Sequence, residues 1–132
     1  MEIESTVFLK KIAVFLEYAI YVPNDYIIYK DDIGEEMYFI IDGKVKILSQ
    51  NESQVIKTLE KGSFFGEIAL FISGSRRICS VVAETFCHLY ILKKKDLSTI
   101  LNSYPKIEEK FRLEGTWICF MQTIFVFKFL KI

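Results

Sequence analysis

The pattern of apolar and polar positions divides the chain into short β-type runs with helical segments at both ends. In residues 7–15 the apolar side chains recur about every 3.6 residues, which predicts a helix with Ser5 or Thr6 as its N-cap. Alternating, β-branched and aromatic runs predict strands over residues 17–22, 26–30, 36–41, 44–48, 54–59, 78–83 and 86–92. Because short strands at regular spacing are typical of all-β folds, we expect a mainly β, eight-stranded jelly-roll β-barrel with flanking helices.

Two dipeptides between these runs predict hairpins. Asp42-Gly43, between residues 36–41 and 44–48, is the strongest short hairpin signal in the chain. Glu84-Thr85 separates the last two strands in the same way. We therefore expect each dipeptide to join two strands that pair with one another.

Two helices are predicted after the last strand. Residues 94–103 place Leu97, Ile100 and Leu101 on one face, and Pro105 can occupy the first position of a further helix. The domain is accordingly expected over residues 5–113, with residues 114–132 as a separate apolar tail.

The tail is apolar almost all round from Thr116 onward and is interrupted by Lys128. It is about one helical turn short of a comfortable membrane span. Three interpretations of the tail stay open. It is a buried or partner-covered helix, an aberrant or truncated gene end, or a membrane segment.

The amino-acid composition argues against several classes of function, namely nucleic-acid binding, metal binding and catalysis. Lysine and arginine together number 17, as do aspartate and glutamate, so no global charge draws the chain to nucleic acid. The three cysteines, Cys79, Cys87 and Cys119, lack metal-ligand spacing and are expected as reduced thiols in the cytosol. His88 is the only histidine, whereas metal-dependent barrel enzymes of the cupin type usually need two or more. We expect no catalysis and no metal.

Residues 62–81 carry the clearest chemistry. Gly66 lets the backbone approach a ligand closely, and the residues after it begin a short helix whose N–H groups favour an anion. An arginine about ten residues later can bind the same anion. Glu67 would repel a phosphate but can accept hydrogen bonds from sugar hydroxyls. A phosphate beside a ribose indicates a nucleotide.

This stretch resembles the phosphate-binding cassette of cyclic-nucleotide-binding domains, in which Phe-Gly-Glu precedes a short helix and an arginine precedes a small-residue strand. The resemblance covers roughly residues 5–113. Within it, the sequence of residues 34–45 is most similar to the domains at the C-terminal end of voltage-gated-type cation channels, including potassium channels. It implies a non-catalytic sensor of cAMP or cGMP, attached to a channel pore or another effector on the cytosolic side of a membrane. It implies no nucleic-acid partner, and any homo-oligomer would form through the parent protein.

The arginine that would bind the phosphate depends on register. Counting forward from Glu67 selects Arg76, and counting back from the strand at Ser80 selects Arg77. A strand fixes its register more firmly than a Ser-Gly-Ser loop does, because a slip by one residue inverts every side chain. We therefore select Arg77.

The resemblance also implies the base contacts. Domains that favour guanine often carry a hydroxyl directly after the arginine, and Ile78 stands there, so we expect cAMP to be preferred over cGMP. Ile47 and Leu59 are expected as an apolar wall against the base, unless they are only barrel core, and Cys79 as a small neighbour. The predicted ligand-binding residues are Gly66, Glu67, Ile68, Ala69, Arg77, Ile78, Cys79, Ile47 and Leu59.

One departure from the family supports a rival function. The last helix normally closes over the purine, and Ile118 stands where channel relatives often carry a basic residue. This chain also has one residue more between Glu67 and the following strand than the channel domains usually have. Loss of the basic contact, together with this extra residue, would fit a degenerate domain that acts as a ligand-free interaction module. Retention of Glu67 and Arg77 favours the sensor. A transcription factor of the catabolite-activator type would need a helix-turn-helix, and no such pattern follows the barrel.

Overall fold

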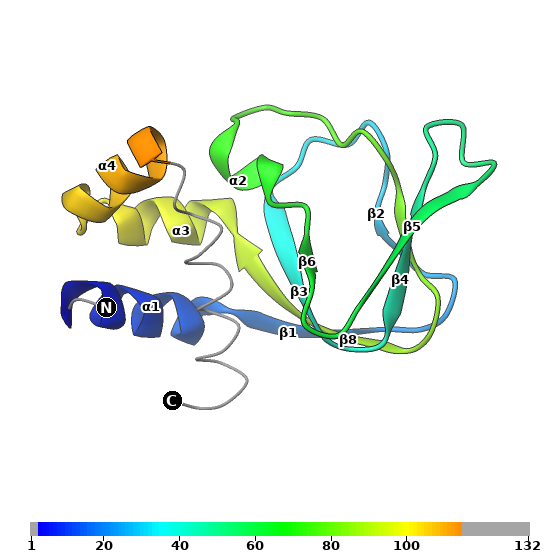
Figure 1. Ribbon diagram of the computed structural model, residues 1–132, viewed down its shortest axis with the longest axis horizontal. Coiled ribbons are helices and arrows are strands. Elements are labelled where there is room, and N and C mark those ends of the chain that lie inside the picture. Colours follow the sequence, from blue (N-terminus) through cyan, green and yellow to red (C-terminus); the bar gives the residue numbers. More distant parts are fainter. Residues whose placement is uncertain (1–2, 115–132) are drawn as a thin grey trace. The chain divides into compact units, whose positions relative to one another are not determined.

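The computed structural model describes residues 3–114, and its β-rich part follows the predicted architecture (Figure 1). Of these residues, 17–94 form one compact unit, called here the β unit. Residues 3–16 and 95–114 form the other, called the helical unit. The predictions for Gly115, Ile118 and Cys119 and for the apolar tail lie outside the described residues.

The β unit contains eight strands in two four-stranded antiparallel sheets, ordered β1-β8-β3-β6 and β2-β7-β4-β5. The pairing is nested, because β1 pairs with β8, β2 with β7, β3 with β6 and β4 with β5. A long hairpin rolled up in this way is a jelly roll, so the predicted fold class is confirmed. The elements are β1 Glu17–Tyr21, β2 Tyr26–Ile28, β3 Glu36–Asp42, β4 Lys44–Leu48, β5 Val55–Glu60, β6 Phe64–Phe65, α2 Ile68–Phe71, β7 Val81–Ala83 and β8 Cys87–Lys93.

The two predicted hairpins are instead connections between the sheets, so that prediction is wrong. Gly43 joins β3 to β4, and Glu84 with Thr85 joins β7 to β8, and in each case the two strands belong to different sheets. The connections bond to each other: Glu84 N–H donates to the Lys44 carbonyl over 2.9 Å, and Lys44 N–H donates to Thr85 Oγ1 over 3.0 Å. These hydrogen bonds between the two connections are found where hydrogen bonding of β3 with β4 and of β7 with β8 was expected.

Gly43 is required by this arrangement. Its φ is +97°, and a Cβ at this position would lie 2.2 Å from the Phe86 carbonyl oxygen. The glycine therefore serves close approach of the two connections rather than a two-residue hairpin. Within the second sheet the tight hairpin is β4–β5, where Ser49 N–H donates to the Gln54 carbonyl over 2.8 Å.

Inward-facing side chains of both sheets form the core of the β unit. Because successive strand residues point to opposite faces, alternate positions meet between the sheets. The buried cluster consists of Ile27, Ile28, Tyr38, Ile40, Val45, Phe65, Val81, Ala83, Cys87, Leu89 and Ile91. Removal of this apolar surface from water is the main stabilising contribution to the unit.

The helical unit consists of α1 Ile3–Phe15, the part of α3 (Lys94–Leu101) from Lys95 onward, and α4 Pro105–Glu114. Phe8 is fully buried, and its ring meets those of Tyr104 and Phe111 edge to face, with centroids 5.4 and 5.9 Å apart. Pro105 opens α4 as predicted. The N-cap prediction for Ser5 or Thr6 is wrong, because α1 already begins at Ile3. None of the helices in the described range is long and apolar enough to cross a membrane.

Candidate functional site

A cavity of about 360 Å³ in the β unit brings the predicted ligand-binding residues together. Its walls come from β2, β4, β5, β6, β7, α2 and the loop of residues 75–79. All of the predicted residues line it: Gly66, Glu67, Ile68, Ala69, Arg77, Ile78, Cys79, Ile47 and Leu59. The structure therefore supports their grouping, while their roles toward a ligand stay predictions.

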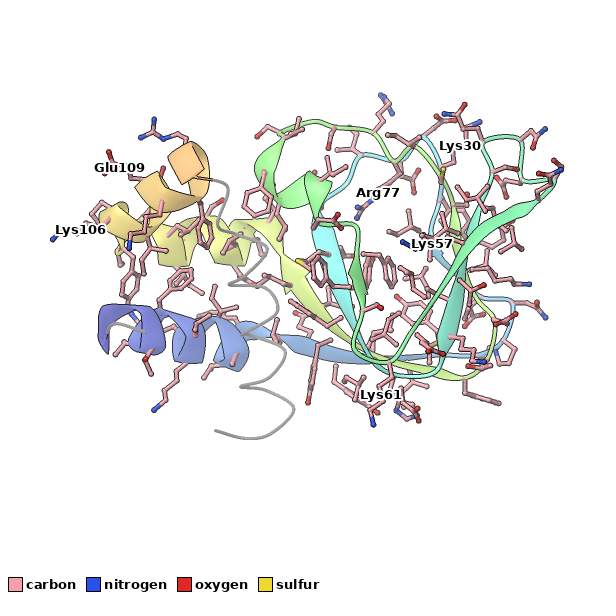
Figure 2. The ribbon with its side chains drawn as sticks, viewed as in Figure 1. Lys30, Lys57, Lys61, Arg77, Lys106 and Glu109 are labelled. Carbon is pink, nitrogen blue, oxygen red and sulfur yellow. The ribbon has the colours of Figure 1, made fainter. Side chains whose placement is uncertain are left out.

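Arg77 places a positive charge in the cavity (Figure 2). The side chain is half-buried, and its guanidinium donates to the Gly66 carbonyl over 3.0 Å and to the Glu36 carbonyl over 2.6 Å. Burial lowers the pKa of Arg77, and the neighbouring Tyr38 and Glu36 act in the opposite direction. A guanidinium has five N–H donors, so two carbonyls leave donors for an anion. Arg77 is thus held in place before any ligand arrives.

Gly66 is shaped to fit that guanidinium. Its φ is +80°, a conformation that L side chains rarely adopt. A Cβ at this position would lie 2.9 Å from Arg77 Nη1 and 3.2 Å from Ile28 Cδ1. The sequence predicts a glycine where backbone approaches a ligand, and the structure adds that the same glycine makes room for Arg77.

Arg76 has a different environment, although it also lines the cavity. It is exposed, and its Nη1 donates to the Asp31 carbonyl over 2.8 Å, while its backbone forms an isolated bridge with Ile33. Arg77 is the one of the two whose side chain contacts the Gly66 backbone. Which of the two arginines would bind a phosphate stays a prediction, and the choice of Arg77 is the one made by the count back from the strand.

The short helix α2 begins directly after Gly66, as predicted for the cassette. Glu67 stands at its N-cap without a side-chain capping bond. Within the described part of the chain, the N–H groups of Glu67 and Ile68 donate no hydrogen bond. Free N–H groups at the start of a helix favour an anion, and here they adjoin the carbonyl that Arg77 contacts.

The wall formed by the second sheet is apolar over most of its width. Ile28 pairs with Val81, and Val81 pairs with Ile47, so the three residues form one row across β2, β7 and β4. Ile47 and Leu59 are only partly buried and pack against the core cluster. This wall can receive the flat apolar face of a base.

Lys57 on β5 is one of the cavity-lining residues that the sequence predictions missed. It pairs with Ile47 and so continues the row to the edge strand of the sheet. The signal was present in the two-residue alternation of the strand, because Lys57 and Leu59 must share a face. Apolarity alone selected Leu59 and Ile47, and Lys57, which lies between Ile56 and Thr58, was not selected.

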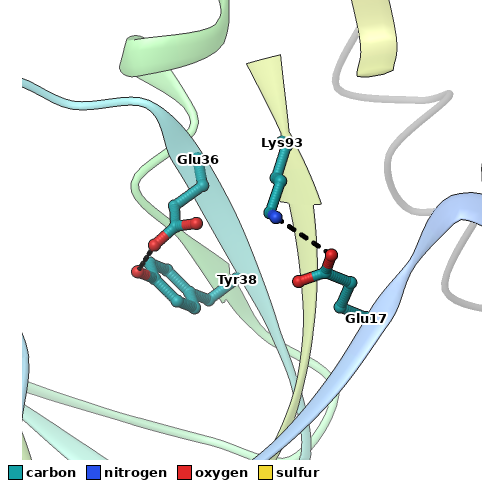
Figure 3. Close-up of polar contacts among 4 residues, drawn as sticks. All are labelled: Glu17, Glu36, Tyr38 and Lys93. Atoms are coloured by element: carbon teal, nitrogen blue, oxygen red, sulfur yellow. Dashed lines mark hydrogen bonds and ion pairs between the residues drawn. The ribbon is translucent and has the colours of Figure 1, made fainter. Parts of the chain in front are cut away.

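β3 supports Arg77 through the Glu36 carbonyl, and Figure 3 shows the contact between the Glu36 and Tyr38 side chains on the same strand. The Tyr38 hydroxyl donates to the Glu36 carboxylate, while the Glu36 carbonyl accepts from Arg77. Burial, followed by the hydrogen bond to Glu36, raises the pKa of Tyr38 well above its usual value. In the same figure Lys93 Nζ lies 2.9 Å from Glu17 Oε1 and links β8 to β1 at the surface.

Arg77 also lines a second cavity of about 240 Å³, together with Asp32, Glu35 and Glu36. These acidic side chains offset the charge of the half-buried guanidinium. No group of three or more His, Cys, Asp or Glu residues suited to hold a metal ion occurs among the described residues.

His88 contacts the Tyr18 hydroxyl on β1, away from the cavity lining, as expected of a structural histidine.

Comparisons with known proteins agree with this site. The family model described as "Cyclic nucleotide-binding domain" matches residues 19–104, and the family expected from the sequence is confirmed. The chain is 45% identical over 100 residues to cyclic nucleotide-gated channel beta-1 of Homo sapiens, covering 74% of this chain and 8% of that protein. It is 40% identical over 96 residues to potassium/sodium hyperpolarization-activated cyclic nucleotide-gated channel 2 of Mus musculus, covering 73% and 11%.

The chain thus spans about a tenth of the length of these relatives. A solved structure, the N-terminal domain of a transcriptional regulator from Streptomyces coelicolor A3(2), superposes with a TM-score of 0.68 at 21% identity. The superposition covers 83% of this chain and 77% of that one, and at this identity it supports the fold alone.

Proposed function

Because the chain belongs to the cyclic nucleotide-binding domain family, we propose that residues 5–113 form a non-catalytic sensor that binds cAMP in preference to cGMP. The observation that carries the proposal is the half-buried Arg77 guanidinium, fixed by two backbone carbonyls in a cavity with an apolar wall. A cyclic nucleotide has one charged phosphate and one flat base. The cavity offers each of them a matching surface.

The phosphate is expected at Arg77 and the start of α2. An arginine about 4 Å from a unit negative charge contributes roughly 4 kcal/mol at an effective dielectric constant of 20, before desolvation is subtracted. Glu67, which lines the same part of the cavity, can accept hydrogen bonds from ribose hydroxyls. No general acid, general base or nucleophile is needed for such binding.

The base preference rests on Ile78. This residue lines the cavity and follows Arg77 directly, and its side chain has no hydroxyl to accept a bond from the 2-amino group of guanine. The binding free energy of cGMP therefore lacks one hydrogen bond at this residue. The expected preference for cAMP is modest, because a single neutral hydrogen bond contributes about 1 kcal/mol.

The effector is proposed from the relatives. The curated relatives named above are ion channels by name, so we place this domain on the cytosolic side of a membrane, with a channel pore as the attached effector. Closure of the C-terminal segment over the ligand would be the bistable element, and a ligand can shift it only by its difference in affinity for the two states. Any homo-oligomer would arise through the parent channel.

Calorimetric titration of the purified chain with cAMP and cGMP tests the proposal, with Arg77→Ala as the control. We expect micromolar binding of cAMP, weaker binding of cGMP, and loss of the cAMP signal in the variant. Equal or inverted affinities would remove the base preference. A folded domain that is silent toward both nucleotides would support the ligand-free interaction module instead.

A further inference from the structure

The row of side chains along the cavity wall ends in a cation. Ile28, Val81 and Ile47 occupy successive strands, and Lys57 takes the next place on β5, at the edge of the sheet. All four line the cavity. Three apolar side chains followed by one ammonium give this wall a single polar end.

The side chain of Lys57 has no hydrogen bond or ion pair with any other described residue. Its side chain extends from β5 into the space that Arg77 also enters (Figure 2). The acidic side chain of the cavity lining is Glu67, which belongs to the α2 end. The ammonium is therefore available to an acceptor on a bound ligand.

The strand order separates Lys57 from the phosphate end. Arg77 contacts Gly66, and a Cβ on Gly66 would meet Ile28 on β2, whereas Lys57 lies on β5, three strands away in the sheet. Neighbouring strands are about 4.8 Å apart, so the backbones at the two ends of the row are roughly 14 Å apart. With its phosphate at Arg77, a purine nucleotide lies along the row with its base toward Lys57.

The base edges differ in what they offer an ammonium. Guanine presents two acceptors side by side, O6 and N7, and lysine binds this pair well, whereas adenine presents N7 beside the N6 amino donor. We infer that Lys57 is a specificity-determining residue that recognises the 6-position of the purine and favours an oxo group there. The inference rests on the proposed nucleotide site.

This effect opposes that of Ile78. Ile78 disfavours guanine at its 2-amino group, and Lys57 favours guanine at its 6-oxo group, so the two residues together keep the preference for cAMP modest. Inosine 3′,5′-cyclic monophosphate separates the two contacts, because its base has the 6-oxo group without the 2-amino group. It should bind more tightly than cGMP.

A purely structural role for Lys57 predicts a different result. Inward-pointing lysines on edge strands also discourage association between sheets, without any ligand. Such a lysine would leave nucleotide affinity unchanged when it is replaced. Lys46 provides a matched control, since it lies on the neighbouring strand β4 and is absent from the cavity lining.

The test is calorimetric titration of the wild type, Lys57→Met, Lys57→Arg and Lys46→Met with cAMP, cGMP and inosine 3′,5′-cyclic monophosphate. In Lys57→Met we expect the affinity for both oxo-purine nucleotides to fall about tenfold, a typical loss for one charge-assisted hydrogen bond, and that for cAMP to stay within about threefold. Lys57→Arg should retain the oxo-purine affinity, and Lys46→Met should match the wild type.

Each other outcome overturns the inference in a recognisable way. If Lys57→Met loses the same affinity for all three nucleotides, Lys57 contacts the phosphate rather than the base. If it loses affinity for none of them, Lys57 acts only as an edge-strand lysine. Both results leave the proposed function standing, because the wild type still binds. A folded wild type that binds none of the three would instead overturn the proposed function and, with it, the role of Lys57.

Discussion

At the end of the cavity where we propose that phosphate binds, one contiguous stretch, residues 66–77, supplies the glycine, the short helix and the arginine. The neighbouring strand β3 supplies a carbonyl that fixes the arginine. At the other end the wall comes from four strands, of which β2, the β4–β5 hairpin and β7 lie far apart in the sequence. The first end depends on backbone geometry and one charge. The second depends on sheet register, so its residues can change identity while the fold is kept. Phosphate binding should therefore be sensitive to single substitutions, and base preference should be tunable.

The largest expected effect separates the two adjacent arginines. Arg77→Ala should weaken cAMP binding by about 2–4 kcal/mol, because a partly desolvated charge-assisted contact is lost. Arg76→Ala should cost less than about 1 kcal/mol, since that side chain is exposed and donates to the Asp31 carbonyl. Parallel calorimetric titrations measure both. The reverse order would show that the extra residue of the loop lies on the other side of the arginine pair.

The next effect tests the backbone at the phosphate end. Gly66→Ala places a methyl group 2.9 Å from Arg77 Nη1, at a φ of +80°. Gly74→Ala is a matched control, because its φ is +72° and a Cβ there meets no atom within 4 Å. Each variant should lose about 1–2 kcal/mol of unfolding free energy from the left-handed backbone.

Only Gly66→Ala should also weaken nucleotide binding, by roughly tenfold, as Arg77 is displaced. Urea denaturation and cAMP titration of the same samples provide the two readouts. Equal affinities in the two alanine variants would mean that Arg77 tolerates the methyl group.

The base end should respond less. Leu59→Ala removes part of the apolar wall, and because Leu59 is only partly buried we expect about 1 kcal/mol less cAMP binding free energy. Ile56→Ala, on the other face of β5 at a side chain that is 58% exposed, should leave binding unchanged. Matching losses from the two variants, measured by titration, would point to a general effect on the strand.

The smallest effect at neutral pH concerns Tyr38, which supports the phosphate end through Glu36. Its pKa is raised above the ordinary value of 10.0 by burial and by that hydrogen bond. The folded protein therefore keeps a proton that the unfolded chain loses, so the contribution to stability is complete below pH 10 and is lost as the pH rises further.

Tyr38→Phe should make the alkaline decline in unfolding free energy shallower, as measured by urea denaturation between about pH 8 and 11.5. Tyr29→Phe, at an exposed tyrosine, is the control and should leave the decline as in the wild type. A Tyr38→Phe protein with an unaltered decline would show that other groups dominate it.

Secondary structure was largely predictable because local pattern determines it. Alternation located β1, β3, β4, β5 and β8, and Pro105 marked the start of α4. Pairing was less predictable. Asp42-Gly43 has the chemistry of a hairpin, yet the rolled topology sends β3 and β4 to different sheets, and bonds between the connections at Lys44 and Thr85 decide the path. A strand expected from residue 78 begins only at Val81.

In the site, too, features set by local sequence were predictable and features set by long-range pairing were not. Gly66, Glu67 and Arg77 are recognisable from a contiguous motif with a clear physical purpose, and strand register was enough to favour Arg77 over Arg76. The contacts that hold Arg77 were not visible in the sequence, because the Glu36 carbonyl comes from a strand about forty residues away. Lys57 was missed for a related reason: its place in the cavity follows from a row across four strands rather than from its neighbours in the chain.

The nested pairing of the strands also sets how the chain can reach this fold. The β4–β5 hairpin closes a short loop, whereas β1 and β8 join residues as far apart as Glu17 and Ile91. Long closures are slow because chain entropy is lost before the contacts form. We expect pulsed hydrogen exchange during refolding to show protection in β4–β5 first and in β1–β8 last. The cavity, which needs β2, β4, β5 and β7 together, would then form late, so a ligand would stabilise the fold only after most of the barrel is assembled.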